Sequence, residues 1–376
     1  MDATCKTSLF WAGLIDMPKN SCIMQIWAEP RKSALPICNY SQILYQFLTF
    51  TQNLKRSHDI LKLAKKYSKQ YHLSLLPCED SNNLLCNLNF LYDEKWENQN
   101  SYPYEILTYL FDSYYVLPQR PDLAALFCWQ AINHSYYVQQ LGDNSIGFCV
   151  DTKGVELVRE ALLAEWNNRY KAILEPFLLK LPMKTFHYVA SYLLKGYAME
   201  SAGIAEKYRA SSYKSLKGKI PVLSDILINS YGNVYNQIAN PLVVENKVDL
   251  GIDTLNKEKS RAITHSFATK LRKLVKGDEV EITFSDIART KKRYSFTEEE
   301  RLSFVLFGIL YASRCNNFHG NVAARMNSIN ANKETFEMYT DIFLMEYIIL
   351  AIHMHSQGIL SDAALDKVKK NEELMI

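Results

Sequence analysis

Apolar residues recur at steps of three and four along most of this chain, which is the pattern of amphipathic helices. The segments that carry it are 43–50, 60–71, 104–116, 123–141, 155–177, 186–210 and 222–238. Alternation of apolar and polar residues, which is typical of strands, is confined to 279–284 and to a short run at 21–27. The pattern therefore predicts a mainly α protein, a helical bundle with small β additions.

Two polar stretches interrupt the helical pattern and suggest how the chain is divided. Residues 93–103 are rich in Glu, Asn and Gln and lack periodic apolar positions, so we expect a helical amino-terminal region of unknown role at 1–100 and a helical domain at 101–376. A second break covers 240–255 and falls inside that domain. No internal repeat is visible, which argues against a solenoid.

The clearest pair of predicted helices lies near the carboxyl end. Thr297 followed by Glu300 is a capping box, and the apolar residues after it continue at helical spacing as far as Arg314. Gly320 and the polar run up to Lys333 end this helix, and a second helix then covers 336–351.

The connection between these two helices contains the residues best suited to chemistry, in the string Arg314-Cys315-Asn316-Asn317-Phe318-His319. A guanidinium is always charged and can hold a phosphodiester, whereas an imidazole titrates near neutral pH and can move a proton. Five positions on an ideal helix separate two side chains by about 140°, so we expect Arg314 or His319 to lie at a helix end. Arg261 and His265 have a spacing that places them on one helix face, which we interpret as a solvated surface.

The string 311–320 resembles the HEPN superfamily, helical-bundle proteins with an Arg-x4-6-His motif between their last two helices. In that family a polar residue usually follows the arginine directly; here Cys315 takes that position and Asn316 comes next. Residues 120–133 are similar to an aromatic-rich early helix of such domains, in which Asn133 would be a polar residue that supports the motif.

The resemblance implies a metal-independent endoribonuclease. His319 would act on the ribose 2′-hydroxyl or the leaving 5′-oxygen, Arg314 would neutralise the phosphate, and Asn316 or Asn317 would orient one of them. HEPN sites are usually made by two facing motifs, so the resemblance implies a homodimer or a related HEPN partner. It also implies a role as a toxin or in anti-phage defence, with a regulatory protein as a possible partner.

An alternative from another class remains open. The chain could be a catalytically inactive helical module that binds RNA or a protein, with Arg314 and His319 acting as a structural cap and hydrogen-bond anchor. RNA cleavage distinguishes the two readings.

Charge adds one candidate surface. The net charge of +3 is too small to indicate a nucleic-acid binder by itself, so clusters of basic residues carry more weight. Lys291, Lys292 and Arg293 form such a cluster shortly before the predicted helix that starts after Thr297 and leads to Arg314, which we call the motif helix. They are candidate RNA contacts, and a solvated loop is the alternative.

The remaining composition predicts a cytoplasmic protein without cofactor or membrane anchor. The eight cysteines include no CxxC pair and no spacing typical of a metal site, which favours reduced thiols. The longest apolar stretch, near 342–352, is interrupted by Glu346 and is too short to span a bilayer. His353 and His355 are predicted to be a surface pair at a helix end.

Overall fold

The computed structural model describes residues 84–98, 102–141, 151–204, 211–244, 247–318, 326 and 331–375. The contacts divide the chain after Lys66, and all described residues belong to the unit Tyr67–Ile376. The predicted amino-terminal helices, the run at 21–27 and His319 lie outside the described residues.

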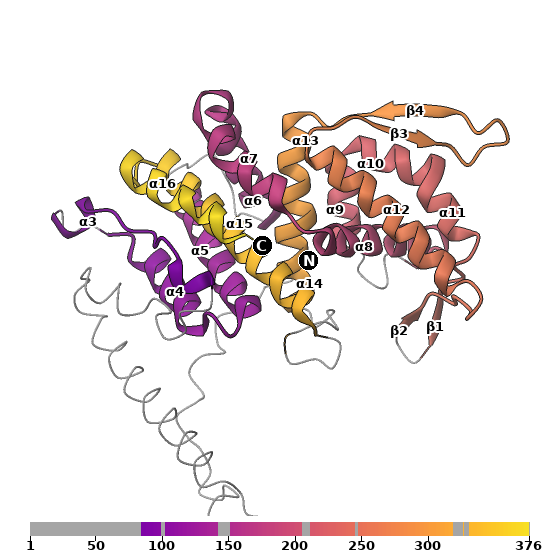
Figure 1. Ribbon diagram of the computed structural model, residues 1–376, viewed down its shortest axis with the longest axis horizontal. Coiled ribbons are helices and arrows are strands. Elements are labelled where there is room, and N and C mark those ends of the chain that lie inside the picture. The colour runs from indigo at the N-terminus through magenta and orange to yellow at the C-terminus, as the bar shows by residue number, and fades with distance from the viewer. Residues whose placement is uncertain are drawn as a thin grey trace, which may run out of the picture. The chain divides into compact units, whose positions relative to one another are not determined.

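The described part is mainly helical, which confirms the predicted fold class (Figure 1). Its first half contains η2 (Leu84–Asn87), α3 (Lys95–Asn98), α4 (Tyr104–Val116), α5 (Pro121–Leu141), α6 (Asp151–Ala164), η3 (Trp166–Tyr170), α7 (Lys171–Lys180), α8 (Met183–Ser201) and α9 (Ser211–Lys219). The second half contains α10 (Pro221–Ile226), η4 (Leu227–Tyr231), α11 (Gly232–Asn236), α12 (Lys257–Val275), α13 (Glu298–Ser303), η5 (Phe304–Tyr311), α14 (Ala312–Phe318), α15 (Lys333–Ser356), α16 (Asp362–Lys369) and η6 (Lys370–Leu374).

The β additions are two antiparallel hairpins. One joins β1 (Leu242–Val244) to β2 (Lys247–Asp249), inside the predicted break at 240–255. The other joins β3 (Val280–Thr283) to β4 (Lys291–Tyr294), with Val280 opposite Tyr294 and Thr283 opposite Lys291. The strand predicted from the alternation at 279–284 is therefore confirmed.

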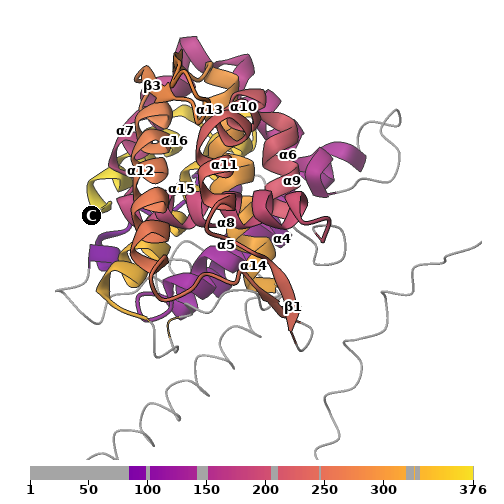
Figure 2. The same cartoon turned by 90° about the vertical axis from the view of Figure 1, so that its right-hand side faces the viewer.

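Helix α15 forms the centre of the core. Nearly every residue from Thr335 to Met354 is buried, as expected for a helix surrounded by other helices. It packs against α5, α6, α7, α8, η5 and α16. Helix α4 packs along α5 and reaches α15 through the Tyr114 and Tyr347 hydroxyls, which lie 2.5 Å apart. Helices α8, α11 and α12 lie side by side as a second group (Figure 2).

Residues before α4 also belong to this core. Leu85, Leu91 and Trp96 are each at most 2% exposed. Asp93 is buried because its carboxylate accepts hydrogen bonds from the backbone N–H groups of Lys95 and Ser361. The described start of the polar stretch, 93–98, thus belongs to the same compact unit as the helices that follow, and its buried carboxylate is satisfied by a local and a distant hydrogen bond.

The helix predicted to lead into Arg314 is present and continuous from Glu298 to Phe318. Thr297 and Glu300 form the predicted capping box. The apolar run Phe304–Tyr311 is π-helical, which periodicity did not predict.

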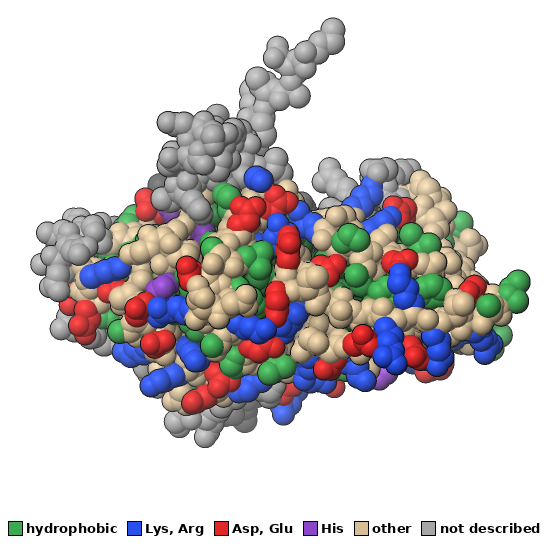
Figure 3. Space-filling model, turned by 90° about the horizontal axis from the view of Figure 1, so that it is seen from above, with side chains coloured by type: hydrophobic (Ala, Val, Ile, Leu, Met, Phe, Trp, Pro, Cys, Tyr) green, Lys and Arg blue, Asp and Glu red, His purple; other side chains and the backbone are tan. Residues whose placement is uncertain are grey.

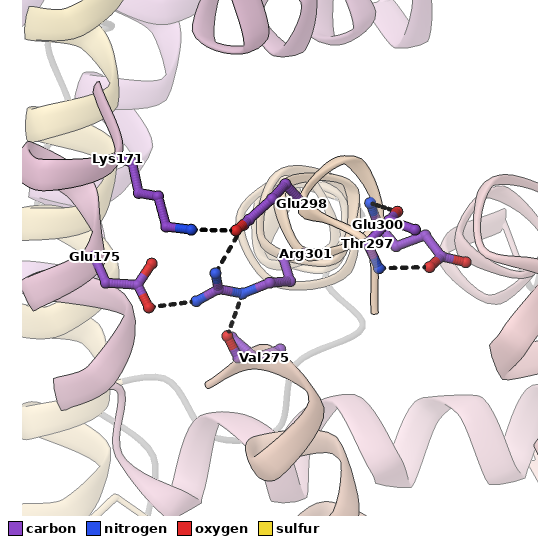
Figure 4. A network of polar contacts seen from close by, with 7 residues as sticks. All are labelled: Lys171, Glu175, Val275, Thr297, Glu298, Glu300 and Arg301. Carbon is purple, nitrogen blue, oxygen red and sulfur yellow. Dashed lines mark hydrogen bonds and ion pairs between the residues drawn. The ribbon is translucent and has the colours of Figure 1, made fainter. Parts of the chain in front are cut away.

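A buried arginine fixes the start of this helix against two neighbours (Figure 4). Arg301 is 3% exposed and donates to the Val275 carbonyl at 2.8 Å, to Glu298 at 2.8 Å and to Glu175 at 2.7 Å. Lys171 pairs with the same Glu298. The network therefore joins α7, the end of α12 and α13.

Candidate functional site

Arg314 lies in α14, where it is held on several sides. Its Nη2 is 3.0 Å from Oδ2 of Asp151, the first residue of α6, and its side chain is 19% exposed. The guanidinium carbon lies 5.9 Å from the centroid of the Tyr311 ring, and Nη1 lies 3.8 Å from the Cys315 sulfur. Burial disfavours the charge, but Cys315 and Asp151 outweigh it and raise the pKa of Arg314. The group is a fixed cation.

Helix α6 packs closely against α5, and this contact positions Asp151, its first residue, next to Arg314. A Cβ added at Gly154 would lie 2.2 Å from the Tyr136 ring of α5, so only glycine permits this contact. Tyr136 is 4% exposed and donates a hydrogen bond to Oδ1 of Asn133 at 2.6 Å. Because the ring is buried and anchored, it cannot easily move aside for a larger residue.

Asp151 and Asn133 line one open pocket of about 290 Å³. The other lining residues are Tyr109, Gln130, His134, Tyr136 and Tyr137. The structure therefore brings the partner of Arg314 and the predicted supporting Asn133 to the same pocket. The amide side chains can bind base edges, and the more exposed rings of Tyr109 and Tyr137 offer faces for stacking.

A second pocket of about 510 Å³ adjoins the first at His134, which lines both. His134 Nε2 is 3.7 Å from the carboxylate of Glu105, and its ring centroid is 6.5 Å from that of Tyr109. Tyr137, in the first pocket, is half exposed. Sequence reasoning missed Asp151, His134 and Tyr137, because only the packing of α4, α5 and α6 brings them together.

For the other residues of the motif, the structure describes only part of what the prediction needs. Asn316 and Asn317 belong to α14, but their side chains lie outside the described residues, as does all of His319. The helix before the motif and α15 after it are as predicted.

The basic cluster lies on β4, away from Arg314. The hairpin adjoins the α13 end of the motif helix and α14 is at the other end (Figure 1). The 17 steps from Thr297 to Arg314 correspond to roughly 25 Å of helix. Each cation has a carboxylate partner: Lys291 pairs with Glu281, Lys292 with Asp225, and Arg293 with Glu279. On the face drawn in Figure 3, basic and acidic side chains are interspersed.

The structure also describes the arginine and histidines that were predicted to lie at the surface. Arg261 is exposed and pairs with Glu258, and His265 is exposed too, which confirms a solvated face. The prediction of a surface pair at the end of α15 is wrong for His353, which is 0% exposed. Its Nδ1 lies 2.8 Å from the Ser135 hydroxyl, because the end of α15 is covered by α5.

Comparisons with protein-family models, curated proteins and solved structures found no match to this chain. Within the described ranges, no helix is both long and apolar enough to cross a membrane. No group of three or more His, Cys, Asp or Glu residues in the same ranges is arranged to hold a metal ion.

Proposed function

We propose that this protein is a metal-independent endoribonuclease of the HEPN type, acting in the cytoplasm as a toxin or in anti-phage defence. The observation that carries the proposal is the setting of Arg314: a fixed cation near the end of a capped helix, paired with a carboxylate that lines a pocket of amide, imidazole and tyrosine side chains. A phosphodiester can replace Asp151 as the partner of a guanidinium, because both present paired oxygens to its fork.

In the proposed reaction the ribose 2′-oxygen attacks phosphorus and the bond from phosphorus to the 5′-oxygen breaks. The products are a 2′,3′-cyclic phosphate and a free 5′-hydroxyl, and the proton lost by the 2′-hydroxyl is balanced by one gained at the leaving oxygen. His319 carries out one of these transfers, Arg314 neutralises the charge that builds on the phosphate, and Asn316 or Asn317 orients one of them.

The second proton transfer needs another group. A homodimer or a related partner with its own motif would supply a second histidine, as the resemblance implies. Lys291, Lys292 and Arg293 would contribute to affinity for the RNA strand rather than to the chemical step, given their position on β4.

The experiment is incubation of the purified chain with total RNA in the presence of EDTA. Fragments are expected from the wild type, and a loss of at least about a hundredfold in rate from Arg314→Ala and His319→Ala, the scale on which removal of a proton-transfer or charge-stabilising group acts. Unchanged cleavage by either folded variant would contradict the assignment of that residue.

A catalytically inactive binding module is the second candidate function. It is favoured by the same ion pair, since Arg314 bound to Asp151 and packed on Tyr311 can serve as a purely structural anchor between α14 and α6. Under this reading the purified protein binds RNA or a protein partner and leaves RNA intact in EDTA.

A further inference from the structure

The second pocket, of about 510 Å³, lies between segments that are distant in the chain. Its lining comes from residues 95–96 and 102–106, from His134 and Ser135 of α5, and from residues 357–359 after α15. The volume falls within the range of about 300–1,000 Å³ that is typical of small-ligand sites. No described residue of the string 311–320 lines this pocket, so the proposed chemistry does not account for it.

One face of α5 joins this pocket to the one beside Arg314. The residues of that face that line the first pocket are Gln130, Asn133, His134 and Tyr137. Their spacing of three, four and seven positions places them on the same side of the helix. Asp151, the partner of Arg314, lines the first pocket, and His134 lines both. A strand with a phosphate at Arg314 can therefore extend along α5 into the second pocket.

The walls of the second pocket are apolar and fixed. Trp96 and Ile106 are 2% and 3% exposed. The Trp96 indole N–H donates to the Ile359 carbonyl at 3.0 Å, and the Lys95 ammonium donates to the Gly358 carbonyl at 2.7 Å. These contacts hold the segment 95–96 against the end of α15. A flat aromatic ligand would enter a site that is already ordered, which lowers the cost of binding.

Glu105 is the carboxylate that this pocket presents. It lies in the first turn of α4, and its side chain is 60% exposed. Among the described residues its ion-pair partner is His134, whose Nε2 lies 3.7 Å from one carboxylate oxygen. That distance is too long for a hydrogen bond, so both oxygens can accept hydrogen bonds from a ligand.

A carboxylate with two accepting oxygens favours guanine among the RNA bases. The Watson–Crick edge of guanine presents two adjacent donors, the N1–H and the exocyclic amine, which can form two parallel hydrogen bonds as an arginine does. Adenine and cytosine present an amine beside a ring acceptor, and uracil presents a single N–H. Each of these bases can therefore form only one such bond.

We propose that the second pocket binds an unpaired guanine of the RNA strand whose phosphate lies at Arg314, with Glu105 accepting from its N1–H and its amine. The inference rests on the RNA binding of the proposed function and adds a base preference to it. Glu105 is a specificity-determining residue and takes no part in the proton transfers. Because the Watson–Crick edge must be free, the strand is single-stranded at this position.

The test is fluorescence anisotropy with 2′-O-methyl oligonucleotides, which measures binding without cleavage. A guanine-containing sequence is compared with the same sequence carrying inosine, which lacks only the exocyclic amine. The wild type should bind the guanine form at least about fivefold more tightly, the lower end of the discrimination that a bidentate contact to a base gives. Glu105→Gln should bind both forms equally, because its amide has only one accepting oxygen.

Glu258→Gln is the matched control, since Glu258 is an exposed glutamate that pairs with Arg261 on α12, and it should keep the guanine preference. Thermal unfolding checks that each variant is folded. Equal binding of the two oligonucleotides by the wild type, or an unchanged preference in folded Glu105→Gln, would overturn the proposal.

Cleavage in EDTA is measured separately, so the two proposals can fail independently. RNA that stays intact while the guanine preference depends on Glu105 would contradict the nuclease chemistry and support the base site. RNA that is cleaved by a protein without guanine preference would support the nuclease and overturn the base site.

Discussion

The Arg314 guanidinium and the Asp151 carboxylate lie 3.0 Å apart and join the predicted motif helix to the start of α6. The carboxylate is 44% exposed, whereas the guanidinium is 19% exposed, so solvent and ligands reach the pair from the Asp151 side. A substrate phosphate would have to compete with this carboxylate for the cation. Substitution of Asp151 should therefore change RNA binding while leaving Arg314, the proposed catalytic cation, in place.

Asp151→Asn should strengthen RNA binding, because it removes the competing negative charge and keeps the side-chain shape. We expect a gain of up to about fivefold, since a partly exposed ion pair contributes up to about 1 kcal/mol. Fluorescence anisotropy with a 2′-O-methyl oligonucleotide measures binding without cleavage. Asp362→Asn, which removes a carboxylate from Arg169 instead, is the control. Weaker binding by Asp151→Asn would show that the carboxylate positions Arg314 rather than competing for it.

Gly154→Ala should disturb the same site through packing. The added methyl would overlap the buried Tyr136 ring, so α6 must shift, and overpacking of this kind costs roughly 1–3 kcal/mol of the free energy of unfolding. Gly218→Ala is the matched control, because that helical glycine has nothing within 4 Å of an added Cβ. Urea unfolding measures both, and equal stability of the two variants would contradict the close approach of α5 and α6.

Arg301→Ala should be among the most destabilising changes in the described part. Removing the guanidinium leaves the Val275 carbonyl, Glu175 and Glu298 without this donor, and breaking a buried ion pair costs about 3–5 kcal/mol. Arg261→Ala removes an exposed pair and should change stability by less than about 1 kcal/mol. Similar midpoints of urea unfolding for the two variants would contradict the structural role of Arg301.

The buried His353 predicts a loss of stability in acid. Burial lowers its pKa to about 4 from the ordinary 6.5, so the unfolded chain binds a proton between these values and the folded chain does not. Its contribution is therefore fully present above pH 6.5 and is lost as the pH falls toward 4. His353→Gln should flatten this part of the profile of unfolding free energy against pH, and an unchanged slope would mean that His353 does not titrate on unfolding in this range.

Periodicity alone predicted most of the helices of the described part, α4 among them. The segment 104–116 was predicted with the same limits that α4 has, and the capping box at Thr297 was confirmed because its hydrogen bonds are local. Apolar spacing predicted a helix over Phe304–Tyr311 but not its π-helical form, since the residues from Phe304 to Leu310 are all buried and no polar face marks the change of period.

The candidate site was predictable only in part, for a related reason. Arg314 and Asn133 were identified from local strings, but their relation depends on Asp151, and Asp151 reaches them because Gly154 allows α6 to approach Tyr136. Likewise His353 was predicted to lie at the surface because its position near a helix end says nothing about α5 covering it. Contacts between distant helices determine these features, and spacing along the chain does not encode them.

The measurement that tests the central claim most directly is analysis of RNA end groups after cleavage of a defined oligoribonucleotide in EDTA. For the wild type, mass spectrometry should find 5′ fragments ending in a 2′,3′-cyclic phosphate, and an oligonucleotide with 2′-O-methyl riboses throughout should stay intact, since the attacking hydroxyl is blocked. His319→Ala and Arg314→Ala should give at least about a hundredfold less product. Intact RNA with the folded wild type, or the same cyclic-phosphate products at the same rate from His319→Ala, would contradict the account.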